Sequence, residues 1–325
     1  MQKKIANITL KTPLIIAPMA GVTNAAFRKL CNEFGAGLVC SEMVSDKAIF
    51  YENSKTLDML KLDNDVHPIS LQIFGSDPKT MAYASRYVSE NTCCDIIDIN
   101  MGCPVNKVVK TGAGSALMKD EDLALEITKS VLDNTNKPVT VKMRLGFDNK
   151  SQNYLSLAKK LENIGVSAIT LHARTRSQMY EGSANWEAIK ALKQELKIPL
   201  IGNGDIKTLS DYIKYKDYAD MIMVGRGIIG NPFLIKEIAD FENGVPFENI
   251  TYLDRIKMCL RHTQNLIELK GEKVAIREMR GLAPHYISGL YKSTTYKNYL
   301  SKINTYKDME ELFNEYIEVL KGVSL

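Results

Sequence analysis

Three shortages limit what this sequence can encode. Its 325 residues include only four histidines and six cysteines, with no CxxC pair and no zinc-like spacing, so we expect no metal site. The lack of a disulfide framework is typical of a reducing cytoplasm. No apolar run approaches the roughly 18 residues of a membrane span. The run near the amino terminus is interrupted by Pro13 and Pro18, so it indicates a strand rather than a signal peptide, and we expect no membrane attachment.

The excess of one sign of charge over the other is also small. The chain carries 42 lysines and arginines against 38 aspartates and glutamates, a formal net charge of +4. This excess is too small to indicate a nucleic-acid partner by itself, so the distribution of the charge has to decide. Oligomeric state has no sequence signal either, and we expect a monomer.

What the chain does contain is a regular alternation of short apolar runs with amphipathic segments. The runs are rich in β-branched residues, as are strands buried on both faces of a parallel sheet. One segment between runs, 151–165, has apolar residues at helical spacing and ends in glycine. The eight runs are 14–20, 38–44, 69–75, 96–102, 139–146, 168–174, 199–205 and 221–227. Eight such repeats predict an α/β fold of the (β/α)₈ TIM-barrel type.

A doubly wound open sheet is the main alternative to the barrel. It would usually carry a GxGxxG turn after its first strand, where this chain has PMAGVTN. After FENGVPFENI (241–250) no strand-like run follows and the periodicity is helical. We therefore predict a barrel domain over 1–245 and a smaller, all-helical domain over 251–325.

Polar residues and glycines stand where the predicted strands end. In a TIM barrel these ends meet at one mouth, where active sites are built. Taken singly, several have a structural explanation: Lys142 can extend to water past the rim, and His172 can be a satisfied core histidine. The glycines after the seventh and eighth strands lie where barrels commonly bind phosphate, and Arg174 and Arg226 are suited to donate to one. The sequence therefore predicts a phosphate-bearing cofactor.

Seven motifs together resemble those of a known family. They are APMAGVT (17–23), LQIFG (71–75), DINMGCP (98–104), VKMR (141–144), LHARTR (171–176), IGNGDI (201–206) and VGRG (224–227). In this order, over essentially the whole chain, they resemble the tRNA-dihydrouridine synthases, closest to the bacterial DusB-like branch. DINMGCP followed by GAGSALM (112–118) is highly specific.

The resemblance implies an oxidoreductase in which NADPH reduces bound FMN, and FMN reduces the C5=C6 bond of selected tRNA uridines to 5,6-dihydrouridine. It places the family's proton donor on Cys103 and a contact to the substrate base on Asn100. It also implies FMN contacts at Pro18, Met19, Ala20, Gln72, Lys142, His172, Asn203, Gly204, Asp205, Gly225 and Arg226. One departure is Asn24, where family members commonly have aspartate; this removes a charge but keeps a hydrogen-bonding side chain.

A thiol suits the role that the resemblance gives Cys103. Hydride delivery to C6 of uracil leaves enolate-like charge that a protonated acid must quench at C5, and a free thiol with a pKa of about 8.5 is mostly protonated at neutral pH. A buried structural thiol and a nucleophile at C6 are the alternatives. Lys142 would face the N1/O2 edge of the flavin or the substrate carbonyl, and the sequence does not separate the two. We expect packing roles for Cys31, Cys40, Cys93, Cys94 and Cys259.

Basic residues concentrate near the carboxyl end. From Arg255 to Lys302 there are ten lysines and arginines against three acidic residues. Arg277 and Arg280 lie one helical turn apart and match basic residues of the family's tRNA-binding domain, so with Arg174 we expect them to contact the RNA substrate. Aromatic residues that can stack on unpaired bases are interleaved: His285, Tyr286, Tyr291, Tyr296 and Tyr299. A solvated helical bundle with core tyrosines is the simpler explanation of the same pattern.

Two other functions stay open at this point. A small-molecule FMN oxidoreductase of the dihydroorotate-dehydrogenase type would use the same barrel on free pyrimidines. A non-catalytic RNA-binding protein would keep the helical region but would not need Cys103. Binding to tRNA that weakens steeply with salt would separate the first alternative from a tRNA enzyme.

Overall fold

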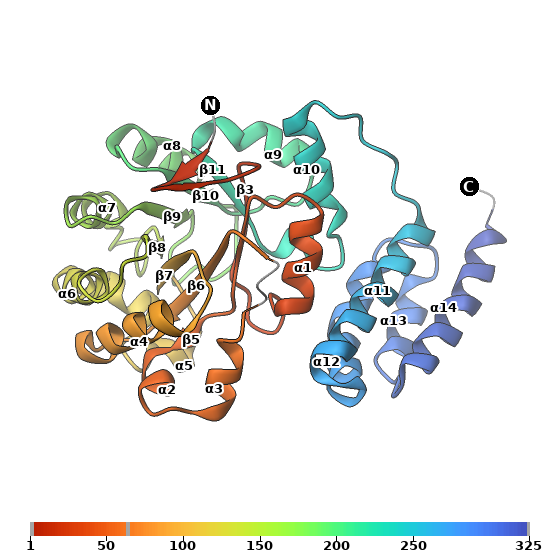
Figure 1. Cartoon of the computed structure of the whole chain (residues 1–325). Helices are drawn as coiled ribbons and strands as arrows, with labels where there is room; N and C mark the ends of the chain where they lie inside the picture. The colour runs from red at the N-terminus through yellow and green to blue at the C-terminus, as the bar shows by residue number, and fades with distance from the viewer. Residues whose placement is uncertain (1–2, 63–65, 324–325) are drawn as a thin grey trace.

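The computed structural model describes residues 3–62 and 66–323. Its centre is a closed barrel of eight parallel strands, which confirms the predicted fold class (Figure 1). The strands are β3 (Leu14–Ile16), β4 (Leu38–Cys40), β6 (Ile69–Phe74), β7 (Ile96–Met101), β8 (Val139–Arg144), β9 (Ala168–His172), β10 (Leu200–Asn203) and β11 (Met221–Val224). Neighbours pair in sequence order, β11 pairs with β3, and β4 closes the ring against β6 with Val39 opposite Ile69. Every strand begins within one residue of its predicted run.

A ring of helices covers the outside of the barrel. Following the strands in order, it contains α1 (Ala25–Glu33), α2 (Asp46–Phe50), α3 (Ser54–Met59), α4 (Pro78–Asn91), α6 (Glu121–Leu132), α7 (Tyr154–Asn163), α8 (Trp186–Glu195), α9 (Leu209–Tyr215) and α10 (Phe233–Asn243). The sequence of α6 shows why these segments are helical. Asp120 accepts a hydrogen bond from the N–H of Leu123 and caps the first turn. Residues at helical spacing, including Ile127 and Val131, form its buried face.

The end of the barrel at which the strands begin is covered by a short hairpin that the sequence did not predict. Its strands, β1 (Lys4–Ile5) and β2 (Ile8–Thr9), are antiparallel. Ile5 and Leu10 belong to the same buried cluster as the inward-facing residues Ile15, Ile201 and Met221. The hairpin therefore closes the amino-terminal end of the barrel and leaves the carboxyl ends of the strands as the open mouth.

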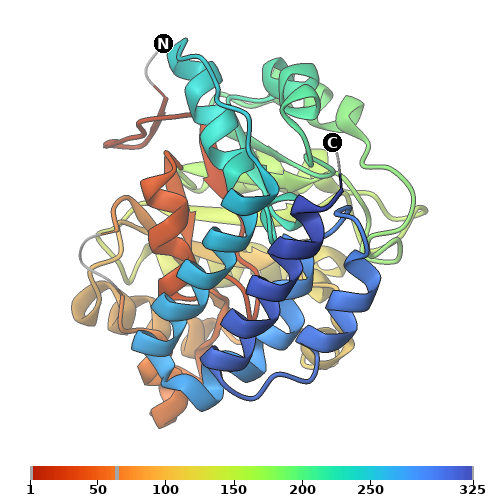
Figure 2. The same cartoon turned by 90° about the vertical axis from the view of Figure 1, so that its right-hand side faces the viewer.

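The carboxy-terminal region is helical, as predicted. It consists of α11 (Tyr252–Lys270), α12 (Glu272–Tyr286), α13 (Ser293–Leu300) and α14 (Tyr306–Lys321), drawn in blue beside α1 in Figure 1. Figure 2 shows these helices stacked over one side of the barrel. Ala26, Leu30 and Phe233 of the barrel helices belong to the same apolar cluster as the core of the helical region. Rings also cross the junction, with Phe27 and His262 centred 5.3 Å apart. The shared cluster holds the two regions against each other.

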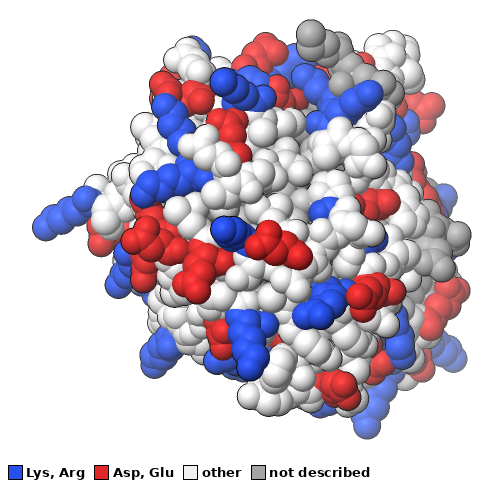
Figure 3. Space-filling model, turned by 60° about the vertical axis from the view of Figure 1, so that its left-hand side comes forward, with Lys and Arg blue, Asp and Glu red and all other residues white. Residues whose placement is uncertain are grey.

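Surface charge is mixed on one face of the barrel. On the face that comes forward in Figure 3, lysines and arginines intermingle with aspartates and glutamates. A face that binds the phosphates of a nucleic acid would instead carry a continuous row of basic residues.

Among the described residues, no helix has the length and apolar character needed to cross a bilayer.

Candidate active site

Two connected cavities open at the mouth of the barrel. One contains about 590 Å³ of empty space over the ends of β10 and β11, and the other contains about 960 Å³ over the ends of β6, β7 and β8. The cavities share the residues Pro18, Met19, Lys142, His172, Tyr180 and Arg226. All eleven residues predicted to contact the cofactor line one or both, and Cys103 and Asn100 line the second.

Cys103 lies on the loop that follows β7, and its side chain is at the floor of the second cavity. The residue is 9% exposed. Its carbonyl oxygen accepts hydrogen bonds from the N–H and the hydroxyl of Ser115, at 3.1 and 2.8 Å. Burial raises the pKa of the Cys103 thiol above its ordinary value. The thiol is therefore protonated at neutral pH.

Asn100 holds the backbone that carries this thiol. Its side-chain oxygen accepts from the N–H of Gly102 at 3.1 Å and from the N–H of Cys103 at 2.8 Å. Its Nδ2 donates to Oε1 of Gln72 at 2.8 Å and makes a long contact of 3.7 Å with the sulfur of Met43. The sequence resemblance predicted a contact between Asn100 and the substrate base. In the structure its oxygen binds the loop of Cys103, and its amide nitrogen is directed to Gln72 and Met43.

The chain of hydrogen bonds continues to a carboxylate inside the barrel. Nε2 of Gln72 donates to Asp98 at 2.6 Å, and the hydroxyl of Thr140 donates to the other oxygen of Asp98 at 2.5 Å. Burial raises the pKa of Asp98 to about 6, although both donors and the charge of Lys142 act to lower it. By accepting from Nε2 of Gln72, Asp98 orients the side-chain amide of Gln72 so that Oε1 of Gln72 faces Asn100. The orientation of the Cys103 loop thus depends on side chains from three adjacent strands.

Lys142 places an ammonium group where the two cavities meet. It donates to Oδ1 of Asn203 at 3.2 Å, and Nδ2 of Asn203 in turn donates to the carbonyl oxygen of Met223 at 2.8 Å. Burial and the neighbouring charge of Arg144 lower the pKa of Lys142 to about 8. His172, which lines both cavities, also has a strongly lowered pKa because of burial and the charge of Lys142. His172 is neutral at physiological pH.

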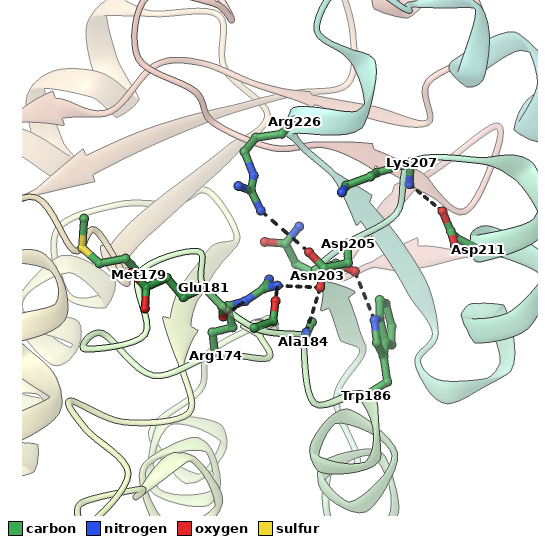
Figure 4. A network of polar contacts seen from close by, with 12 residues as sticks. Arg174, Met179, Glu181, Ala184, Trp186, Asn203, Asp205, Lys207, Asp211 and Arg226 are labelled. Atoms are coloured by element: carbon green, nitrogen blue, oxygen red, sulfur yellow. Dashed lines mark hydrogen bonds and ion pairs between the residues drawn. The ribbon is translucent and has the colours of Figure 1, made fainter.

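Asp205 lies between two arginines at the ends of β9 and β11 (Figure 4). Arg174 donates to its Oδ2 at 2.6 Å, and Arg226 lies 3.7 Å from its Oδ1. Burial raises the pKa of Asp205, but the hydrogen bonds from Arg174 and from the N–H of Ala184 outweigh it and hold the pKa below its ordinary value. Asp205 also has a positive φ of 54°, in the turn that follows β10. Its carboxylate is thus occupied by protein donors.

Arg174 does not reach either cavity. It is 1% exposed, and it donates to the carbonyl oxygens of Glu181 and Gly182 as well as to Asp205. The prediction of a substrate or phosphate contact at Arg174 is therefore not supported by its placement. Its guanidinium braces the loop between β9 and α8. Arg226 is the exposed cation of this pair, with 48% of its side chain accessible.

The loop after β11 presents backbone donors to the first cavity. Arg226 and Gly227 begin a single 3₁₀ turn, so their N–H groups have no acceptor within it. None of the hydrogen bonds recorded between described residues uses these two groups. A Cβ at Gly227 would overlap the carbonyl oxygen of Ile206, so this glycine lets the loops after β10 and β11 touch. The arrangement supports the predicted phosphate position.

Tyr180 and Arg144 were not among the predicted site residues. Tyr180 is 48% exposed on the loop after β9, with its ring 4.2 Å from the guanidinium of Arg226 and 5.6 Å from that of Arg144. Arg144 donates to the carbonyl oxygen of Gly102 at 2.8 Å, beside Cys103. Its position in VKMR was visible in the sequence, whereas a tyrosine in an irregular loop had no signal.

Asn24 has a role that needs no charge. Its side-chain oxygen accepts from the N–H of Phe27 at 3.1 Å and caps α1. Asparagine and aspartate are about equally good at this position. Asparagine at this position therefore keeps the helix cap that an aspartate would provide.

The candidate RNA-contacting residues of the helical region divide into two groups. Arg277 is exposed on α12, whereas Arg280 donates to the carbonyl oxygen of Ile303 and to Asn304, both at 2.8 Å. His285, Tyr291 and Tyr299 are exposed. The stacking prediction is wrong for two tyrosines, which are buried in the core at 1% and 4% exposure: Tyr286 and Tyr296. The simpler explanation of core tyrosines holds for these two.

The remaining cysteines form no disulfide among the described residues. Cys31, Cys40, Cys94 and Cys259 are buried, as expected for packing residues, and Cys93 is half-buried. No group of histidine, cysteine and acidic side chains within 3–62 and 66–323 has the arrangement of a metal site.

Known proteins with similar sequences are dihydrouridine synthases. The family model described as dihydrouridine synthase matches residues 15–321. The chain is 38% identical over 317 residues to the probable tRNA-dihydrouridine synthase of Rickettsia conorii, covering 96% of each protein. It is 39% identical over 304 residues to tRNA-dihydrouridine synthase B of Vibrio vulnificus, covering 93% of this chain and 94% of the relative.

Solved structures share the fold. The old yellow enzyme homologue from Zymomonas mobilis has a TM-score of 0.55 at 14% identity, covering 78% of this chain and 95% of that one. Histamine dehydrogenase from Rhizobium sp. 4-9 has a TM-score of 0.56 at 13% identity, covering 86% of this chain and 50% of that one. At this identity the likeness concerns the barrel alone.

Proposed function

The chain belongs to the dihydrouridine synthase family, and we propose that it is a flavin-dependent reductase of uridines in tRNA, with FMN as cofactor, NADPH as reductant and Cys103 as proton donor. The observation that carries the proposal is the geometry of the mouth. Cys103 lines the same continuous space as Lys142, Arg226 and His172, although these residues are spread over more than a hundred positions of sequence. With tRNA as the substrate, we propose that the reaction takes place in the cytoplasm.

The donors at the mouth fit FMN. The phosphate would be held by the guanidinium of Arg226 and by the N–H groups of Arg226 and Gly227, which have no acceptor among the residues that the structure describes. The ring system would be held by Lys142, Asn203 and Gln72, which combine a half-buried cation with amide groups. Burial lowers the pKa of Lys142. Its ammonium donates to one side chain among the described residues, that of Asn203, so an anionic ligand beside it would be favourable.

Bound flavin would supply the hydride that reduces C6 of the uracil ring. The residues of this chain must then present the uridine, exclude water and protonate C5. The thiol of Cys103 is suited to the last step because burial keeps it protonated. Asn100 and Arg144 both hold the peptide group between Gly102 and Cys103, Asn100 through its N–H and Arg144 through its carbonyl oxygen. The neutral imidazole of His172 can donate one hydrogen bond without competing for the transferred proton.

The helical region is the proposed tRNA contact. A uridine within folded tRNA must swing out of its stack to reach a barrel mouth, at a cost of a few kcal/mol. Contacts elsewhere on the tRNA must offset this cost. Exposed residues of the helical region that can provide them are Arg277, His285, Tyr291 and Tyr299.

The test is a reaction with purified protein, NADPH and tRNA from a dihydrouridine-free strain, followed by mapping of the modified position. We expect dihydrouridine at one or a few positions. Cys103→Ala should keep its flavin and its NADPH oxidation but form dihydrouridine about 100-fold to 10,000-fold more slowly, the usual contribution of a general acid. Turnover of free pyrimidines without salt-dependent tRNA binding would support the small-molecule alternative instead. Full activity of Cys103→Ala would remove the proposed donor.

A further inference from the structure

A third cavity lies next to the one that contains Cys103. It is formed by the chain from Met43 to Lys47, by the end of β6 at Phe74–Ser76 and by the loop after Cys103, and it contains about 1,180 Å³ of empty space. Ala20, Met43 and Val105 line both this cavity and the Cys103 cavity. The two spaces are therefore neighbours across a thin wall. No step of the proposed reaction uses the third cavity.

The floor of this cavity is apolar and continuous with the reactive thiol. Met43, Phe74, Val108 and Ala113 pack in one hydrophobic cluster with Cys103. Val105 is 50% exposed on the wall between the two cavities. An apolar surface of this kind, open to solvent and beside an active site, usually binds a ligand.

The rim of the cavity is basic. Lys47 and Lys107 are both exposed and line it from opposite loops. Neither ammonium group forms a salt bridge with a carboxylate of residues 3–62 or 66–323. The one carboxylate in the lining, that of Asp46, accepts from the hydroxyl of Thr80 at 2.5 Å and from the N–H of Lys47 at 2.5 Å. The cavity thus combines an apolar floor with two cations at its edge.

We propose that this cavity binds the nucleotide adjacent to the target uridine in the same RNA strand; the inference rests on the proposed function. A uridine inserted beside Cys103 stays bonded to its neighbours, so the next base must lie one sugar–phosphate unit away, at the rim of the same mouth. Single-stranded bases are recognised by apolar and aromatic surfaces, and their phosphates by basic side chains. The apolar and aromatic surface is provided by Phe74, Met43 and Val105. The basic side chains are those of Lys47 and Lys107.

The other ligand that must visit this mouth is the nicotinamide reductant, whose adenosine half also has a flat base and phosphates. The two occupants differ in a measurable way. A cavity for the neighbouring nucleotide changes the KM for tRNA, whereas a cavity for the reductant changes the KM for NADPH. The experiment is built on that difference.

Thr111→Trp places a large side chain at the lining of the cavity, at an exposed position. Thr111→Val is the matched control, because it also removes the hydroxyl that donates to Val108 at 2.7 Å but keeps the size. In FMN-loaded protein we expect Thr111→Trp to raise the KM for tRNA about tenfold, the size expected for one stacked base. The KM for NADPH and the tRNA-independent oxidation of NADPH should stay unchanged.

A second pair of variants tests the basic rim. Lys47→Ala with Lys107→Ala should raise the KM for tRNA and make it less sensitive to salt. The control is Lys129→Ala with Lys197→Ala, which removes the same charge from two exposed positions outside the cavity lining. Equal effects of the two pairs would overturn the proposed site.

The final arm uses the RNA. After the modified position has been mapped, tRNA with an abasic site on either side of the target uridine is given to wild-type and Thr111→Trp protein. We expect one of the two abasic sites to raise the wild-type KM and to have no further effect on Thr111→Trp. A rise in the KM for NADPH, or additive effects of the abasic site and Thr111→Trp, would overturn the proposal. If no protein forms dihydrouridine while NADPH oxidation persists, it is the proposed function that fails.

Discussion

Replacing Asn100 tests whether the thiol depends on its loop being held in place. Asn100→Ala removes the acceptor of two backbone N–H groups, at Gly102 and Cys103, and the donor to Gln72. A buried polar group left without a partner costs roughly 1–3 kcal/mol, less where water can replace the lost bond. Asn100 is 6% exposed and lines a cavity, so water can reach some of the three groups. We expect Asn100→Ala to lower the free energy of unfolding by about 2–4 kcal/mol.

The kinetic consequence separates positioning from substrate binding. If Asn100 mainly holds the Cys103 loop, Asn100→Ala lowers kcat more than it raises the KM for tRNA, because a misplaced acid slows the proton transfer. Asn100→Asp is the control, since a carboxylate can accept both N–H groups but cannot donate to Gln72. It should recover most of the lost kcat while remaining less stable than the wild type. Denaturant unfolding and steady-state assays of FMN-loaded protein measure both quantities. A large rise in KM with unchanged kcat and stability would refute the reasoning and restore Asn100 as a substrate contact.

Two further predictions concern cations. The pKa of about 8 at Lys142 means that its ammonium loses its proton as pH rises through that value, so the affinity of the flavin-free protein for FMN should fall on the alkaline side. Lys142→Met should bind FMN more weakly with a flatter pH dependence in a fluorescence titration, and an unchanged slope would rule Lys142 out as the titrating group. In the helical region, Arg277→Ala should weaken tRNA binding at unchanged stability, whereas Arg280→Ala should mainly lower the melting temperature, because Arg280 is bonded to Ile303 and Asn304. Equal losses of tRNA affinity without destabilisation would contradict this distinction.

The barrel was predictable because its strands are buried on both faces. Such strands leave continuous apolar runs, and their eightfold alternation with helical segments has few other solutions. The hairpin β1–β2 was missed for the opposite reason. Two strands of two residues each are too short to show a period, and their apolar residues, Ile5 and Leu10, are defined by the barrel that they cover.

The convergence of the site residues was also predictable, since the topology brings the carboxyl ends of parallel strands together. What each side chain does there was not. Asp98 stood within a recognised motif, yet its role depends on Gln72 and Thr140 from the two adjacent strands. The same holds for the tyrosines, because basic and aromatic residues interleave in sequence both in an RNA-binding face and in a helical core. Only the packing of α12, α13 and α14 separates Tyr286 and Tyr296 from Tyr291 and Tyr299.

Arg174 and Arg226 are two similar residues whose different roles could not be predicted from the sequence. Both follow a strand end, both are arginines, and both are suited to a phosphate. The turn of the chain at Asp205, with its positive φ, presents the carboxylate to Arg174 at hydrogen-bond distance and to Arg226 at 3.7 Å. Arg174 also donates to the carbonyl oxygens of Glu181 and Gly182, which lie on an irregular loop. One arginine becomes a buried brace and the other remains the accessible cation. The difference between the two arginines depends on the position of a third residue, Asp205. The sequence around either arginine does not predict that position.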